Sequence, residues 1–171
     1  MFQQMKLNLD SKESQYMKRL IQGGSWPSFS KATAKWIEMV GPNKPWDHKS
    51  EKDGIPKLPT KLALKGTNYF FRFPDDFNYE YFYDIWSNIH YGYVGSAIGF
   101  TSQYLHTGAS VVDIFSLGGV DLPDVEAVQI GIDLWNKKGQ FLTENDLRDI
   151  VLKRREKLQR QPISAKGTLI P

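Results

Sequence analysis

The sequence predicts an α+β fold in which a single, predominantly α-helical domain carries one small β element. Its 171 residues are 40% apolar, which is enough for one hydrophobic core. Several segments place apolar residues at helical spacing, whereas one short stretch is rich in strand-forming residues. No apolar run reaches the roughly 18 residues that cross a bilayer, so we expect no membrane insertion. The chain has no cysteine, which excludes disulfide scaffolds, thiol nucleophiles and cysteine-ligated metal sites.

Two helices, a loop and a strand are expected in the N-terminal half. Residues 11–22 are expected to form a short helix that stops at Gly23-Gly24. Residues 29–40 keep their apolar side chains close to a 3.6-residue period, which predicts a second helix. Four prolines and two glycines between residues 41 and 60 predict an irregular surface loop. Strand-type residues at 67–73 then predict the β element.

The middle of the chain is expected to continue with a helix and a glycine-containing segment. Residues 78–90 can form a helix that places Phe82, Trp86 and Ile89 on one side. Residues 92–106 alternate glycines with apolar residues, and glycine at this spacing lets another backbone approach closely.

Two further helices are expected before the C-terminus. The first opens at Asp121, with a proline in its first turn, and runs to Lys138 before Gly139. The second covers about residues 143–160, and its start resembles a capping box with aspartate in place of glutamate. We therefore expect one domain over residues 1–160 and a C-terminal tail over residues 161–171.

The charge of the chain is unevenly placed. Residues 1–66 hold 12 Lys/Arg against 6 Asp/Glu, residues 67–150 hold 4 against 12, and residues 151–171 hold 6 against 1. An acidic middle therefore lies between two basic ends. A pI of about 9.0 is typical of nucleic-acid-binding proteins. Here the basic charge lies mostly outside the segment that holds most candidate site residues, and solvated basic ends are the simpler explanation.

The first candidate site is the loop from Gly41 to Lys49. Trp46 lies there among prolines and charged residues. One interpretation is that Trp46 only anchors this loop to the domain. The other is that it fixes a rim from which Asp47 and Lys49 reach a substrate, because loops on rigid scaffolds often carry such groups.

The second candidate site is the stretch from Asn78 to Phe100. On a helix, Glu80, Asp84 and Asn88 would form one polar stripe at i, i+4 and i+8. Such a stripe can simply face solvent, yet its neighbours are mostly aromatic rather than lysines. Carboxylates beside aromatic rings suit sugar chemistry, because the rings desolvate one carboxyl group and offer flat faces to a sugar. His90 is a candidate general base or a helix cap.

Other motifs argue against several enzyme classes. The three histidines, at positions 48, 90 and 106, show no metal-ligand spacing such as HExxH, so we expect no metal and no cofactor. Ser96 is not in a GxSxG elbow because Gly99 falls one place too far along. No lysine follows the glycines as in a phosphate-binding loop.

Both stretches contain pieces that resemble, in order, the polymorphic toxin type 44 (bacterial toxin 44) family across residues 5–138. The pieces are Trp36, Gly41, Pro45 to Lys49, Asp84, Asn88, Tyr91-Gly92, Val94 to Phe100, Gly108-Ala109 and Asp121 to Ile132. Three residues depart from the family pattern: His48 replaces the usual tyrosine, Trp86 a frequent glycine, and His90 a frequent asparagine.

The resemblance implies a secreted antibacterial toxin with a cognate immunity protein. Because the N-terminus lacks the apolar stretch of a signal peptide, we expect another module or apparatus to deliver the domain into rival bacteria. Asparagine at position 90 in the family makes an indispensable histidine base doubtful. The expected catalytic set therefore centres on Asp47, Lys49, Asp84, Asn88 and Tyr91. The residues expected to bind substrate are Trp46, Trp86, Asn88, Tyr91 and Gly92.

A shorter stretch, residues 79–102, is similar to the start of chitosanases of the lysozyme superfamily, which leaves a lysozyme-like fold open. It would make Glu80 the general acid and Asp84 or a later carboxylate its partner. Three hypotheses follow. The domain cleaves peptidoglycan glycan with Glu80 or Asp84 as acid and Asp47 or Asp84 as second carboxylate. Alternatively, it is a ribonuclease that uses Lys49, His90 and the basic C-terminal helix, or a non-enzymatic binding domain.

Overall fold

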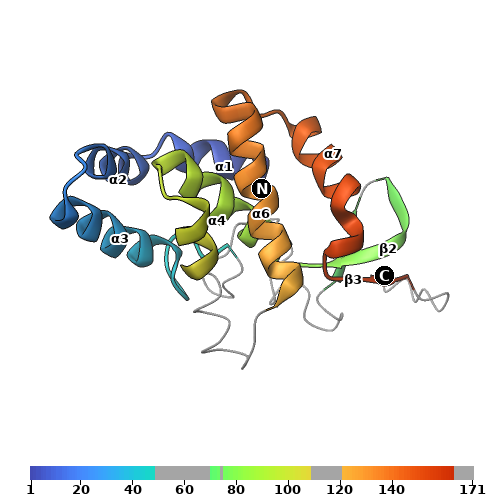
Figure 1. Ribbon diagram of the computed structural model, residues 1–171. Helices are drawn as coiled ribbons and strands as arrows, with labels where there is room; N and C mark the ends of the chain where they lie inside the picture. Colours follow the sequence, from blue (N-terminus) through green and yellow to red (C-terminus); the bar gives the residue numbers. More distant parts are fainter. Residues whose placement is uncertain (49–69, 74, 109–120, 164–171) are drawn as a thin grey trace.

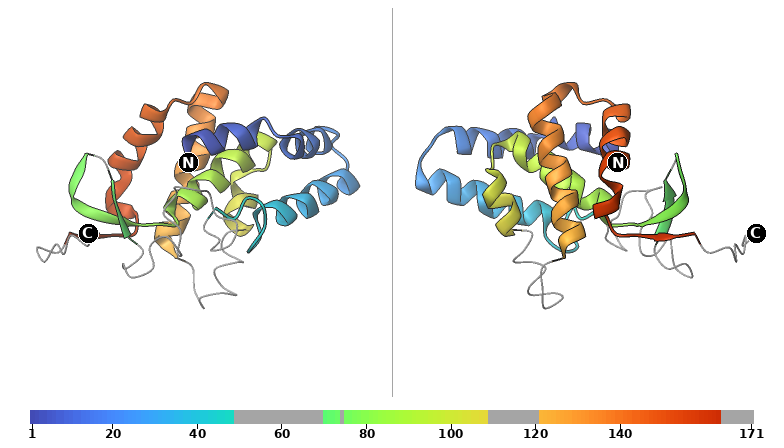
Figure 2. Two further views of the ribbon diagram at one scale, coloured as in Figure 1. Left: turned by 180° about the vertical axis from the view of Figure 1, so that it is seen from behind. Right: turned by 45° about the vertical axis from the view of Figure 1, so that its right-hand side comes forward.

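The computed structural model describes residues 1–48, 70–73, 75–108 and 121–163 (Figure 1). Helices make up most of this part, and a three-stranded antiparallel sheet lies at one end, opposite helices α2 (Lys12–Gln22) and α3 (Trp26–Val40) (Figures 1 and 2). The predicted α+β class, mostly helical with a small β element, is confirmed. Within the described ranges, no helix has the length and apolar character needed to cross a membrane.

The first two expected helices are present with small changes at their ends. Helix α2 follows Ser11, whose hydroxyl accepts a hydrogen bond from the backbone three residues on. Helix α3 begins three residues earlier than expected, because Ser25 caps it in the same way and Pro27 fits its first turn. The turns at residues 41–48 agree with the expected loop, whose remainder, residues 49–60, lies outside the described residues.

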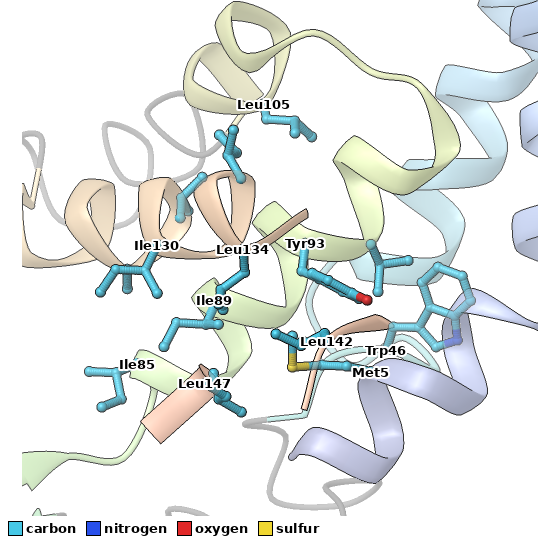
Figure 3. Close-up of a cluster of buried hydrophobic side chains, with 14 of the residues drawn as sticks. Met5, Trp46, Ile85, Ile89, Tyr93, Leu105, Ile130, Leu134, Leu142 and Leu147 are labelled. Carbon is cyan, nitrogen blue, oxygen red and sulfur yellow. The ribbon is translucent and has the colours of Figure 1, made fainter. Parts of the chain in front are cut away.

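Helix α1 (Phe2–Leu9) was not expected from the sequence. Only two of its residues are buried: Met5 is fully buried and Asn8 is 5% exposed. A helix this short is marginal on its own, so packing stabilises it, mainly against α4 (Ile85–Ile98). Figure 3 shows Met5 beside Leu142 in the interior.

The helix expected over residues 78–90 is present only from residue 85, and the expectation is wrong for the residues before it. Strand β2 (Asp76–Phe82) pairs antiparallel with β1 (Phe70–Phe73) and β3 (Arg160–Pro162), and α4 begins only at Ile85. Tyrosine and phenylalanine fit either a strand or the apolar face of a helix. The pairing with β1 and β3 therefore decides that these residues form a strand. The described part of the expected 67–73 strand is β1.

The two C-terminal helices confirm their predicted starts. Helix α6 (Leu122–Lys138) has a proline in its first turn and Gly139 directly after its end. Helix α7 (Glu144–Arg154) begins with the expected capping box, in which the Thr143 hydroxyl accepts from Asp146 N at 3.2 Å and Asp146 Oδ2 accepts from Thr143 N at 3.0 Å.

The end of the chain differs from the expectation. The regular helix stops at Arg154, and a 3₁₀ turn (Arg155–Lys157) leads into β3, which pairs with β2. The tail expected over 161–171 is therefore wrong for residues 161 and 162, because their backbone completes the sheet. Residues 164–171 lie outside the described residues.

Helices α4 and α6 cross in direct backbone contact at the centre of the molecule. A Cβ added at Gly92 would lie 2.1 Å from the carbonyl oxygen of Val128, and one added at Gly131 would lie 2.1 Å from that of Ile89. Only glycine allows this approach. The expectation that the 92–106 glycines let a backbone come close is confirmed at Gly92. Buried side chains from both helices meet around this crossing (Figure 3).

Candidate functional site

Helix α4 places three of the expected site residues on one face. Asp84 is the residue before its first turn, Asn88 lies one turn on, and Tyr91 lies three residues further. The Asp84 carbonyl accepts hydrogen bonds from the backbone of Ser87 (2.9 Å) and Asn88 (3.2 Å), which begins the helix. The Asp84 side chain is 8% exposed. Within the described residues, the side-chain nitrogen of Asn88 is buried and has no acceptor.

Glu80 does not join this face. It lies on strand β2, opposite Arg72 of β1 and Gln161 of β3, and its carboxylate accepts a 2.5 Å hydrogen bond from Gln161 Nε2. The stripe of Glu80, Asp84 and Asn88 on one helix is therefore wrong, because the chain changes from strand to helix between residues 82 and 85. The chitosanase similarity paired Glu80 with Asp84 or a later carboxylate; this pairing stays a prediction, with Glu80 on β2 and Asp84 at the start of α4.

Trp86 joins the start of α4 to the sheet. Its ring stacks on Phe73 with centroids 5.7 Å apart and lies 5.8 Å from Phe71. Tyr81 is fully buried beside Phe73 and donates a 2.5 Å hydrogen bond to Asp76, and burial raises its pKa. The residues after β2 thus place Trp86 against the aromatic side chains of β1. Whether Trp86 contacts substrate stays a prediction.

Trp46 is buried, as the anchoring interpretation expects. It is 6% exposed, its backbone N–H donates to the carbonyl of Met39 at 2.8 Å, and its ring packs edge-to-face on Trp36 and on His90. Asp47 supports the same turn, because its carboxylate accepts a 2.8 Å hydrogen bond from Asn43 N. Both contacts favour an anchor over a rim that reaches substrate. Lys49 lies outside the described residues.

Tyr91 and Gly92 have packing partners of their own. The Tyr91 ring lies 5.2 Å from that of Trp36, and its hydroxyl donates a 3.2 Å hydrogen bond to the carbonyl of Leu105. Burial raises the pKa of Tyr91 to about 12, so the phenol keeps its proton and is suited to donate a hydrogen bond. Gly92 lies in the α4–α6 crossing, so its place in the fold is explained by helix packing.

His90 and His48 form a buried polar cluster with Asn8 of α1. The two imidazole rings meet edge-to-face with centroids 4.2 Å apart, and both residues are almost fully buried, with His90 1% exposed. Asn8 Nδ2 lies 2.8 Å from His90 Nε2 and 3.4 Å from His48 Nε2. Burial lowers the pKa of His48 to about 4 and that of His90 well below its usual range, so both rings are neutral.

This cluster changes what His90 can do. A general base must reach the proton that it removes, but His90 is buried and its Nε2 already faces the Asn8 amide. The interior position therefore argues against His90 as the general base. Asn8 itself could not be found from the sequence, because its segment shows no motif and its partners lie 40 and 82 residues away.

The structure therefore brings together two of the segments that carry expected site residues. Trp46 and His48 of the loop meet α4 at His90. Asp124, which the sequence suggested only as part of a helix start, is a second buried carboxylate at 8% exposure in the first turn of α6. Among the described residues, no group of three or more histidine, aspartate or glutamate side chains is placed to hold a metal.

The family comparison gives one match. The family model described as bacterial toxin 44 matches residues 35–137. This segment contains every site residue expected from the sequence; Asn8 of α1 and Gln161 of β3 lie outside it. No curated protein and no solved structure matches the chain.

Proposed function

The chain belongs to the bacterial toxin 44 family, and on that premise we propose that this toxin domain is a hydrolase that cuts the glycan strands of peptidoglycan. The observation that carries the proposal is the position of Asp84. Its carboxyl group is buried at the start of α4, on the same face as Asn88 and Tyr91. Two residues further on, Trp86 packs on Phe71 and Phe73 of β1.

Glycoside hydrolysis needs two carboxyl groups, one that protonates the leaving oxygen and one that assists water or forms the glycosyl intermediate. We assign the first role to Asp84, in place of Glu80, whose carboxylate is bound to Gln161 within the sheet. Asp124 is our candidate for the second role, because it is the other buried carboxylate of the described residues. Asn88 and Tyr91 would hold the sugar by hydrogen bonds.

The test is digestion of purified peptidoglycan sacculi, with released muropeptides identified by mass spectrometry. Asp84→Asn should reduce release by about 100-fold or more, because it keeps the shape of the side chain but cannot transfer the proton. Asp124→Asn should cause a comparable loss. Asp149→Asn, the same change at an exposed position on α7, is the matched control and should act like the wild type. No release by the wild-type protein under any condition would refute the proposal.

A ribonuclease is the second candidate, favoured by the exposed cations of α6 and α7. Lys137, Lys138 and Lys153 line one hollow of about 210 Å³, together with two aspartates. This function would need another group to move protons, because His90 is buried. Degraded ribosomal or transfer RNA in poisoned cells would favour it over the wall.

The target compartment separates these functions directly. Expression of the domain without a protecting immunity protein, directed either to the cytoplasm or to the periplasm, should kill only from the periplasm if peptidoglycan is the substrate. Killing from the cytoplasm would support RNA. Unchanged toxicity of the single variants Asp84→Asn, Asn88→Ala and Tyr91→Phe would instead support a binding domain. We propose that delivery depends on another module and that a cognate immunity protein protects the producing cell.

A further inference from the structure

Asn8 lies where the two candidate site segments meet. The loop carries Trp46, Asp47 and His48, and α4 carries Asp84, Asn88 and His90. Their closest ring contact is the one between His48 and His90. Asn8 reaches both rings from α1, outside the 35–137 segment that matches the family.

The hydrogen bonds around Asn8 determine the state of both histidines. Gln4 Nε2 donates to Asn8 Oδ1 at 2.8 Å, so the Asn8 nitrogen is the group that faces the imidazoles. An amide nitrogen carries two hydrogens and accepts none, so each Nε2 must offer a lone pair. Both rings are then neutral and carry their proton on Nδ1. This assignment agrees with their burial.

The backbone around Asn8 is held as firmly as its side chain. The Asn8 carbonyl accepts hydrogen bonds from the hydroxyls of Ser11 (2.8 Å) and Ser14 (2.5 Å) at the corner between α1 and α2. Ser14 is itself buried. The side-chain amide of Asn8 is thus a fixed donor, and it sets which nitrogen of each ring accepts the hydrogen bond.

We propose that Asn8 is a positioning residue, which holds His48 and His90 as neutral acceptors and thereby fixes the 46–48 loop against α4. The idea that the two segments serve one reaction rests on the proposed function. The arrangement of Asn8, His48 and His90 is independent of that function. Asn8 touches no substrate in this proposal and acts through the two histidines.

Protonation of either ring should open this arrangement. A protonated imidazole has N–H groups on both nitrogens, so its Nε2–H would point at the N–H groups of Asn8. The α-amino group of Met1 disfavours a positive charge on either ring, and a protonated His48 would disfavour one on His90. From the loop, Trp46 presents an aromatic ring to His90. In the described residues, no carboxylate is hydrogen-bonded to either imidazole, so nothing there compensates the charge.

The test is an NMR titration of the three histidine side chains in the wild type and in Asn8→Asp. Aspartate has nearly the same shape but accepts hydrogen bonds, so it should favour protonated rings and raise the pKa of at least one of His48 and His90 by about 1 or more. His106 is the internal reference, because it hydrogen-bonds Gln129 and not Asn8. Its titration should be the same in both proteins.

Two results would overturn the proposal. One is a wild-type protein in which His48 and His90 titrate near pH 6.5 like a free imidazole. The other is Asn8→Asp with both pKa values unmoved. If Asn8→Asp does not fold, the tautomers of the wild-type rings decide: a proton on Nε2 of either ring would overturn the proposal, and protons on Nδ1 of both would support it.

A readout with substrate then tests the positioning role. The pH profile of muropeptide release should shift toward higher pH in Asn8→Asp, whereas a purely structural role would lower release equally at every pH. An unshifted profile would refute positioning. Because the titration needs no substrate, a failed glycan hypothesis and a failed Asn8 hypothesis give different results.

Discussion

Neutral histidines in a protein interior make stability depend on pH. The unfolded chain binds a proton at His48 below about pH 6.5, whereas the folded chain binds it only near pH 4. The contribution of the neutral His48 to the free energy of unfolding is therefore fully present above pH 6.5 and is lost as the pH falls toward 4. His90 contributes in the same direction, because its pKa is also lowered by burial.

We expect the free energy of unfolding to fall by about 2 kcal/mol between pH 7 and pH 5 from His48 alone. Urea unfolding at both pH values measures it. His106→Gln, which changes a histidine outside the cluster, should keep the same pH dependence. A wild-type protein equally stable at pH 5 and pH 7 would contradict the neutral cluster.

At this scale, the contacts of the candidate residues were only partly predictable from the sequence. It offered the anchoring role of Trp46 as one interpretation, and the structure supports it. It placed Glu80 with Asp84, which is wrong because a strand replaces the helix. It could not find Asn8, since a hydrogen bond across 82 residues leaves no local pattern.

Among the elements, α4 and α6 have the closest contact. Gly92→Ala should reduce the free energy of unfolding by about 3 kcal/mol, because its Cβ meets the backbone of α6, which cannot move aside without shifting the helix. Urea unfolding gives the value.

Gly95→Ala in the same helix is the matched control for this crossing. Its Cβ would lie 2.5 Å from the end of the Leu105 side chain, which can change rotamer, so the loss should be clearly smaller. If Gly92→Ala were as stable as Gly95→Ala, the backbone contact would not be as close as described.

Strand β3 depends on Arg160 more than on its neighbours. Arg160 stacks 3.8 Å from the Tyr79 ring, lies 3.7 Å from Asp76 and pairs with Glu156 at 2.6 Å, with 10% of its side chain exposed. Arg160→Ala should cost about 2 kcal/mol in urea unfolding, since it leaves the Asp76 charge poorly compensated.

Arg155→Ala is the control for this pair. Arg155 lies at the same 3.7 Å from Asp76, but 44% of its side chain is exposed. Its removal should cost about 0.5 kcal/mol or less, because solvent screens such a pair. Equal losses for the two variants would show that burial does not set the strength of these ion pairs.

Helices whose ends are marked by capping residues, proline or glycine were predictable from the sequence. Strands that form only by pairing with distant strands were not. The Pro123 and Gly139 ends of α6 and the capping box of α7 were read correctly from a few residues each. Strands β2 and β3 depend on each other, and each lies about 80 residues from its partner. Their aromatic and polar residues alone fit a helix or a tail equally well.

On the scale of the whole molecule, the hydrophobic core includes residues outside the segment that matches the family. Met5 and Met17, both fully buried, and Val151 of α7 lie outside residues 35–137. Expressed alone, residues 35–137 should show no cooperative unfolding transition by circular dichroism, because α4 and α6 would lose their cover. The full chain, as control, should unfold in one transition. A cooperative transition in the short segment would refute this.

The broad features of the molecule were the most predictable. The α+β class and the toxin family both follow from patterns that extend over many residues, and both are confirmed. The extent of the domain, the substrate and the catalytic residues stay predictions, because they depend on a few contacts in three dimensions.

The contact between His48 and His90 also means that substitutions at these two positions are not independent. Positions 48 and 90 touch each other in the interior. A change at one leaves the other with a neighbour of different shape and hydrogen-bonding character, and Asn8 faces both. The effects of substitutions at positions 8, 48 and 90 on the free energy of unfolding should therefore be non-additive.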